Sequence, residues 1–200
     1  MRKQHLAEAL GGLCGAPDAA GRRLMAGCEG FGVEMTFGEV ELERQFNPVD
    51  VIELVAASRD WSFERPCEDE IAMSVAGVWT EYAVSFSWMP DNEALHLGCA
   101  FDMKVPAHRE VEVLRLLAKI NPQLLVGHFD LWSAEGAVMF RHALLLSGGA
   151  DPTSQQAERL LTCALENCER FYQAFQFVVW ASKDADDALA CSLFETAGSA

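Results

Sequence analysis

The feature that most constrains the fold is a strict alternation of side-chain character along residues 80–88. One parity of this segment is apolar and consists of Tyr82, Val84, Phe86 and Trp88. The other parity holds small or charged side chains. A period of two over such a length is typical of an antiparallel β-strand with one buried face. The rest of the chain must therefore supply neighbouring strands and a cover for the apolar side.

Strand patterns recur on both sides of this segment. Apolar side chains alternate through residues 70–75 and through residues 94–103, and turn-forming residues separate both segments from the central strand. The complete set of predicted strands is residues 62–65, 70–75, 78–89, 94–103, 126–132 and 137–146. The first of these is short because Pro66 stops it.

Helical signals lie before, between and after the strands. Asn47 followed by Pro48 predicts a helix start, because asparagine caps a helix and proline suits its first position. Thr153 or Ser154 is expected to cap the longest helix, and Ser182 the last one. The predicted helices are residues 47–59, 106–121, 153–179 and 183–194. This order predicts an α+β fold.

The second face of the central strands is unusually small. It consists of Ala83, Ser85 and Ser87 on one strand and of Ala94, His96, Gly98, Ala100 and Asp102 on the next. A surface of this kind either faces solvent or lets another backbone or helix approach closely. The residues alone leave both alternatives open.

Charge and composition limit the classes of partner. The 200 residues have a net charge of −15 and a pI of about 4.6, and they contain no basic cluster that would displace counterions from a nucleic acid. Half of the residues are hydrophobic, which is enough for a sizeable core, but no apolar run reaches the length of a membrane span. We therefore expect neither nucleic acid nor a membrane as a partner.

Cysteine usage indicates the compartment. The seven cysteines are scattered and odd in number, which is typical of a reducing environment in which cysteine serves as a small apolar residue. The N-terminus makes a poor signal peptide because no apolar stretch follows Arg2 and Lys3. A cytoplasmic location is expected.

The motifs that carry catalysis or bind cofactors are missing. The sequence has no paired metal-ligand motif, no Gly-x-Ser-x-Gly elbow and no phosphate-binding glycine loop. We therefore expect no enzyme, no metal site and no cofactor. The most interesting polar residues are His128 and Asp130, which share a strand face with Trp132. With Arg141 or His142 opposite, they form either a cross-strand ion pair or the site of an enzyme or small-ligand binder.

One helix carries more apolar surface than the sheet alone can cover. In residues 106–121, Val111, Leu114 and Leu117 lie on one face of a broad apolar arc. We interpret these three residues, together with Trp132, His128 and Asp130, as a candidate surface for a protein partner or for a homodimer. Burial in the core is expected for the tryptophans at positions 79, 88, 132 and 180.

Seven short segments resemble the YbjN family. They are residues 47–50, 69–73, 79–82, 86–89, 95–97, 127–132 and 175–180, in the order of the family. The resemblance implies a fold similar to that of type III secretion chaperones, in which a twisted antiparallel sheet is flanked by helices. It also implies a homodimer that binds a segment of a protein partner without catalysis and acts as a bacterial sensory transduction or stress regulator. Residues 1–35 are expected to form a flexible extension and residues 36–197 a single domain.

Overall fold

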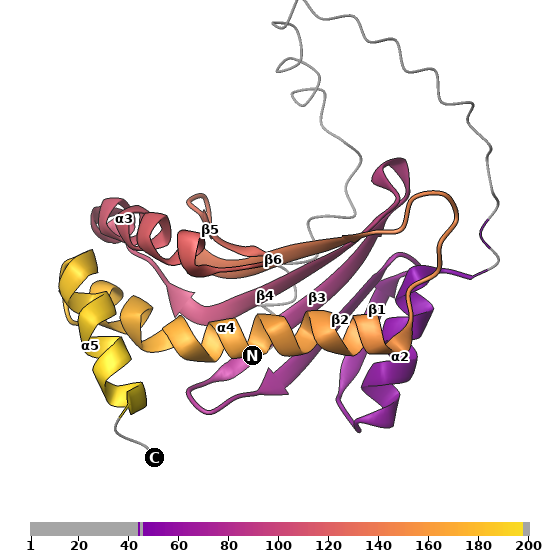
Figure 1. The fold of residues 1–200 in the computed structure, drawn as a ribbon, viewed down its shortest axis with the longest axis horizontal. Helices are drawn as coiled ribbons and strands as arrows, with labels where there is room; N and C mark the ends of the chain where they lie inside the picture. Colours follow the sequence, from indigo (N-terminus) through magenta and orange to yellow (C-terminus); the bar gives the residue numbers. More distant parts are fainter. Residues whose placement is uncertain (1–43, 45, 198–200) are drawn as a thin grey trace, which may run out of the picture.

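The computed structural model describes Arg44 and residues 46–197 (Figure 1). The predicted flexible extension, residues 1–35, lies outside the described residues, and so does the predicted start of the domain at residue 36. The described part contains a helix, four strands, a helix, two strands and two final helices. The predicted α+β class and the predicted order of elements are therefore confirmed.

The sheet has six strands, and all neighbouring strands are antiparallel, in the order β1-β2-β3-β4-β6-β5. The strands are β1 Phe63–Cys67, β2 Glu70–Ala76, β3 Glu81–Met89, β4 Ala94–Lys104, β5 His128–Trp132 and β6 Ala137–Leu145. The long strands β3 and β4 occupy the middle of the sheet, and the short strands β1 and β5 form its two edges. Every strand predicted from side-chain alternation is present, with shifts at its ends.

Four α-helices and three single turns of 3₁₀-helix accompany the sheet. They are α2 Pro48–Ser58, η3 Pro90–Asn92, η4 Ala107–Arg109, α3 Glu110–Ile120, η5 Asn121–Gln123, α4 Ser154–Val179 and α5 Ala185–Ala197. The helix predicted for residues 106–121 therefore begins later than expected. Its first turn is the separate 3₁₀ turn η4, which precedes α3.

Local capping explains two of the helix starts and corrects a third. The Asn47 side chain accepts a hydrogen bond from the Val49 amide at 2.9 Å, and Thr153 forms a capping box with Gln156. The prediction that Ser182 caps the last helix is wrong. Ser182 has a positive φ of 57° and lies outside the helix, whereas the Asp184 carboxylate accepts a hydrogen bond from the Asp187 amide at 2.8 Å.

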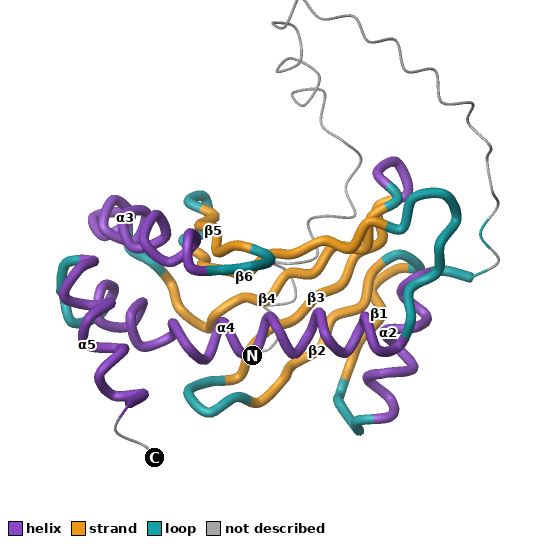
Figure 2. The backbone as a smooth tube through the Cα atoms, viewed as in Figure 1, coloured by secondary structure: helices purple, strands orange, loops and turns teal. Residues whose placement is uncertain are grey.

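The longest helix lies lengthwise along one face of the sheet. Figure 1 shows α4 in this position, with α2 toward one end of the sheet and α3 and α5 toward the other, and Figure 2 separates the helices from the strands in the same view. The four helices and the inward face of the sheet contribute to one hydrophobic core. We call this side of the sheet the helix-covered face.

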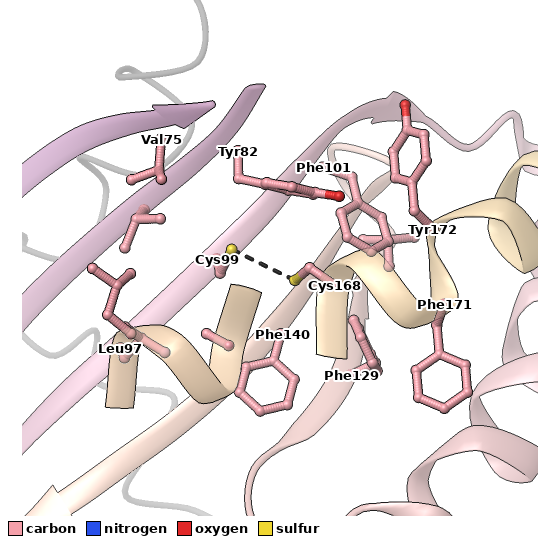
Figure 3. Packing of buried hydrophobic residues seen from close by; sticks show 14 of the residues in the cluster. Val75, Tyr82, Leu97, Cys99, Phe101, Phe129, Phe140, Cys168, Phe171 and Tyr172 are labelled. Atoms are coloured by element: carbon pink, nitrogen blue, oxygen red, sulfur yellow. Dashed lines mark hydrogen bonds between the residues drawn. The ribbon is translucent and has the colours of Figure 1, made fainter. Parts of the chain in front are cut away.

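Aromatic rings join α4 to the sheet at the centre of this core. The ring centroid of Phe101 on β4 lies 5.3 Å from those of Tyr172 and Phe175 on α4. Tyr82 and Phe129, from β3 and β5, pack around the same ring (Figure 3). Tilted and edge-to-face pairs of this kind contribute about 0.5–1.5 kcal/mol each beyond their burial.

The two faces of the sheet differ as the alternation predicts. The register pairs Val84 with Cys99, and Cys99 with Phe140, on the helix-covered face. The next position pairs Ser85 with Gly98 on the opposite side. Within the described residues no helix packs on that opposite side, and we call it the helix-free face.

Candidate functional site: the helix-free face of the sheet

A row of three polar side chains crosses the helix-free face. The register places Glu70 on β2 beside Ser87 on β3, and Ser87 beside His96 on β4. Their relative exposures are only 3%, 6% and 7%. We call these three residues the polar row. They were not singled out from the sequence because the row forms only when three separate strands are paired.

Each member of the polar row has a buried polar atom without a hydrogen-bond partner. These atoms are Oε1 of Glu70, Oγ of Ser87 and Nδ1 of His96. Native proteins rarely leave such atoms unpaired, because each one costs about 1–3 kcal/mol. The row therefore has hydrogen-bonding capacity that the described residues do not use.

The protonation of His96 follows from its one hydrogen bond. The Arg141 Nε donates to Nε2 of His96 at 3.2 Å, so the neutral ring carries its proton on Nδ1. Burial, together with the positive charge of Arg141, lowers the pKa of His96 to about 4. At neutral pH the row therefore presents an uncharged N–H donor at this position.

The pKa of Glu70 is shifted upward, in the opposite direction to that of His96. Burial raises the pKa of its carboxyl group, because the charged form loses hydration. Its oxygens can accept hydrogen bonds, whereas the Nδ1–H of His96 and the Ser87 hydroxyl can donate them. The polar row can thus offer both donors and acceptors to a group that lies against it.

Small side chains next to the polar row leave room for close approach. Gly98 and Ser85 face each other across the strands, and a Cβ atom added to Gly98 would lie only 3.2 Å from the Ser85 Oγ. Ala83 and Ala100 form the next pair. A foreign backbone can lie against such a surface without steric conflict.

The edge strand β5 and its neighbour β6 contribute the expected ion pair. Arg141 on β6 lies 3.0 Å from the Asp130 carboxylate on β5, and His128 is the register partner of Arg141. The Asp130 side chain is 39% exposed and that of Arg141 30%, so the pair contributes little to stability by itself. Its effect is to hold Arg141 beside His96.

The alternative site of His128, Asp130 and His142 does not assemble on one face. His142 pairs with Leu97 on the helix-covered face, whereas His128 and Asp130 lie on the helix-free face. Consecutive residues of a strand point to opposite sides, which separates His142 from the other two. Among the described residues, no group of three His, Cys, Asp or Glu side chains can hold a metal ion.

The six residues predicted as one partner surface fall into three places. Val111 and Leu114 point outward from α3, with exposures of 63% and 50%. Leu117 is only 6% exposed and belongs to the core, so its assignment to an accessible surface is corrected: it lies on the inward side of α3. His128, Asp130 and Trp132 lie on the helix-free face.

Other exposed apolar side chains were missed or misjudged. Leu125 and Val126, between α3 and β5, are 98% and 41% exposed, and alternation gave no sign of this. Trp79 and Trp180 are 44% and 59% exposed, so the expectation that they are buried is wrong. Trp79 lies in a tight turn and Trp180 at the end of α4, where neither can reach the core.

A family comparison now adds to this geometry. Residues 48–177 match the model of the YbjN family, described as "Putative bacterial sensory transduction regulator". The chain belongs to the YbjN family. The match spans the sheet and most of α4. None of the curated proteins compared with this YbjN-family chain matches it.

Three solved structures resemble this YbjN-family chain. The crystal structure of YbjN, "a putative transcription regulator from E. coli", has 12% identity and a TM-score of 0.46, and covers 67% of this chain and 90% of that one. The ExsC–ExsE complex has 20% identity and a TM-score of 0.44, with coverages of 63% and 94%. The HopA1–SchA chaperone–effector complex has 16% identity and a TM-score of 0.42, with coverages of 59% and 87%. At these scores the likeness carries no inference about binding.

The open edges of this YbjN-family sheet are protected against strand addition. Asn121 bonds both backbone groups of Phe129 on β5, accepting from its N–H at 2.8 Å and donating to its carbonyl at 3.0 Å. Asp130 accepts from the Leu131 amide at 2.9 Å. The other edge, β1, is short, contains Pro66 and has an irregular register. Such edges discourage pairing with another chain, so a partner has to use a face.

A shallow hollow beside α4 is a second concave feature. It lies between the end of α2 and the middle of α4, with apolar walls and an acidic rim. Its lining residues are Arg59, Trp61, Glu158, Leu161, Thr162, Leu165, Glu166 and Glu169. Among its lining residues, Glu169 has one buried oxygen without a hydrogen-bond partner, Oε2. A search of the described helices finds none long and apolar enough to cross a membrane.

Proposed function

We propose that this YbjN-family protein is a non-enzymatic regulator that binds a segment of a protein partner on its helix-free face. The observation that carries the proposal is the polar row of Glu70, Ser87 and His96. Each of its side chains is buried and has one polar atom without a hydrogen-bond partner, on a face where no described helix lies. A face built this way is completed by a ligand that brings its own hydrogen-bonding groups.

The proposed ligand is an extended peptide segment. Its backbone N–H and C=O groups match the donor and acceptor atoms of the polar row, and the small residues around Gly98 admit a backbone at close range. The net charge of −15 favours neutral or basic segments over acidic ones. Cytoplasmic action is part of the proposal, and the free cysteines of the described residues support it.

The proposal includes a homodimer formed through α3. Val111 and Leu114 expose large apolar side chains on the outward side of this helix, and Leu125 follows in the chain. A second copy related by a two-fold axis would cover the same strip on both subunits. Val111→Asp combined with Leu114→Asp is therefore expected to give a monomer in analytical ultracentrifugation. Leu54→Asp, a change of the 69% exposed leucine on α2, is the control that keeps the dimer.

A substitution on the helix-free face tests whether the partner binds there. Wild-type protein, Ser85→Arg and Leu54→Asp are each used to capture proteins from the source cell's lysate, after circular dichroism has shown that each is folded. We expect a partner that wild type and Leu54→Asp retain and Ser85→Arg loses, because the arginine side chain fills the helix-free face. Ala72→Arg introduces the same side chain at a less buried position of the same face. It serves as a second test if Ser85→Arg fails to fold. Equal capture by all four proteins would refute the proposed site.

A further inference from the structure

We propose that the hollow beside α4 is a binding site for a small organic cation with an apolar body, that is, for a hydrophobic amine. The hollow has a volume of about 490 Å³. Small-molecule sites in proteins commonly have volumes of roughly 300–1,000 Å³. The hollow is lined mainly by α4, which covers the side of the sheet opposite to the helix-free face (Figure 1). The inference therefore goes beyond the proposed partner site and does not depend on it.

One wall of the hollow is a stripe along α4. Leu161, Leu165 and Glu169 are spaced four residues apart, which places them on one face of the helix. Trp61 adds an apolar wall from the segment that follows α2. Leu165 and Trp61 pack against the core but are only partly buried. Their remaining apolar surface is available to the apolar part of a ligand.

The charges around the hollow are unbalanced. Its lining includes one basic side chain, Arg59, and three acidic ones, Glu158, Glu166 and Glu169. Arg59 lies 3.2 Å from the Glu158 carboxylate, so these two charges compensate each other. Glu166 has a contact of 3.8 Å with Arg159, but both side chains are largely exposed and the pair contributes little. Negative charge therefore remains where Glu166 and Glu169 line the hollow.

Glu169 is held in position by the turn between β2 and β3. Its Oε1 atom accepts a hydrogen bond from the Val78 amide at 2.6 Å. Gly77 makes room for this contact, because a Cβ atom at that position would clash with the same oxygen. Burial, and after it the charge of Glu169, raise the pKa of the nearby Tyr82 hydroxyl, which stays neutral. Within the described part of the chain, no basic side chain pairs with the Glu169 carboxylate, so its charge is fixed beside the hollow without compensation.

These features select the class of ligand. An ammonium group beside Glu166 and Glu169 would relieve the repulsion between two carboxylates that are neighbours on one helix face. The apolar body of the ligand would displace water from Trp61 and Leu165. A neutral apolar molecule gains only the second contribution, and an anion is repelled. The hollow therefore favours a hydrophobic amine.

Isothermal titration calorimetry of the full-length chain tests this class with three probes of similar shape. The probes are phenethylamine, which is a cation, phenethyl alcohol, which is neutral, and phenylacetate, which is an anion. We expect phenethylamine to bind wild type at least about ten-fold more tightly than phenethyl alcohol, because hydrogen bonds to a charged group are the stronger ones. Phenylacetate is expected not to bind. Equal affinities for the amine and the alcohol, or no binding of the amine, would overturn the inference.

Variants locate the site. Glu169→Gln keeps an oxygen for the Val78 amide but removes the charge, and is expected to weaken phenethylamine binding about ten-fold. Glu64→Gln, the same change on the helix-free side of β1, should bind as wild type does. Thr162→Arg fills the hollow with a bulky cation at an exposed position and should abolish binding, whereas Ala190→Arg on α5 should not. Phenethylamine binding that Thr162→Arg retains would show that the site is elsewhere.

A peptide distinguishes a free amine from a lysine side chain of a protein. The capped peptide acetyl-Gly-Phe-Lys-Gly-amide is expected to bind at least about ten-fold more weakly than phenethylamine, because the apolar walls leave its backbone groups unpaired. Tighter binding of the peptide would overturn the assignment to a free amine. Ser85→Arg, on the helix-free face, should leave phenethylamine binding unchanged. Failure of this inference and failure of the proposed function are therefore separate results.

Discussion

At the scale of single residues, the buried members of the polar row decide how stability depends on pH. The pKa of His96 is lowered to about 4 in the folded protein, while the unfolded chain has the ordinary value of 6.5. Between these two pH values the unfolded state binds more protons than the folded state. Stability must therefore rise with pH across this window and be lost as the pH falls.

Replacing His96 with glutamine should flatten this pH dependence. The linkage of the two pKa values corresponds to about 3 kcal/mol between pH 4 and pH 6.5. We expect wild type to lose about this much of its free energy of unfolding over the window relative to His96→Gln. Urea unfolding at pH 4.5, 5.5 and 7 measures the effect. His108→Gln, a change of an exposed histidine, should leave the wild-type slope unchanged.

Glu70 allows a stabilising substitution. Its carboxyl group is buried and its pKa is raised, so ionisation at neutral pH works against folding, and this contribution grows as the pH rises above the unfolded value. Glu70→Gln keeps the shape and removes the charge, and is expected to increase the free energy of unfolding at pH 7 by about 1 kcal/mol. Glu68→Gln, in the exposed turn, is the matched control. A loss of stability in Glu70→Gln alone would show that the charge is compensated.

At the scale of elements, a side chain closes the edge of the sheet. Asn121, just after α3, occupies the place of a neighbouring strand by bonding both the N–H and the C=O of Phe129. This is why the sheet ends at β5 although two backbone groups there point outward. The same contact ties α3 to the sheet.

Asn121→Ala should therefore both destabilise and expose the edge. Losing the partners of two half-buried backbone groups is expected to cost about 1–3 kcal/mol in urea unfolding. The freed edge should also raise concentration-dependent light scattering, because unpaired strand edges invite association. Gln123→Ala, two residues further on in an exposed position, is expected to show neither change. Unaltered stability in Asn121→Ala would mean that water replaces the amide without cost.

At the scale of the whole molecule, the aromatic centre joins the sheet to α4. Phe101 is 2% exposed and contacts rings from β3, β5 and α4. Truncating it leaves a cavity between α4 and the middle of the sheet. The helix-free face depends on this packing indirectly, since the same strands carry both faces.

Phe101→Ala is expected to cost about 3–5 kcal/mol of unfolding free energy. Differential scanning calorimetry should show a lower melting temperature with one remaining transition, because the core is shared by all four helices. Leu54→Ala removes an exposed side chain of comparable character and should change the melting temperature little. Two separate transitions in Phe101→Ala would instead indicate that helices and sheet melt independently.

Local patterns predicted much of the architecture. Alternation located β2, β3 and β4, and the pair Asn47-Pro48 and the cap candidates Thr153 and Ser154 marked two helix starts, because these signals act over a few neighbouring residues. The sequence also placed His128, Asp130 and Trp132 on one face and offered Arg141 as one of two cross-strand partners for Asp130. These successes share a cause, since each depends on spacing within one strand or hairpin.

What the tertiary structure alone decided depends on long-range pairing. Glu70, Ser87 and His96 come from three strands, and only the register between those strands turns them into a buried row. The local sequence likewise does not indicate that Leu117 is buried and Trp180 exposed. Their burial depends on how α3 and α4 are placed against the sheet. By itself, the sequence determined the elements and their order, through short-range periodicity and capping. The folded molecule decided which polar groups are buried together, because strand register brings distant residues into contact.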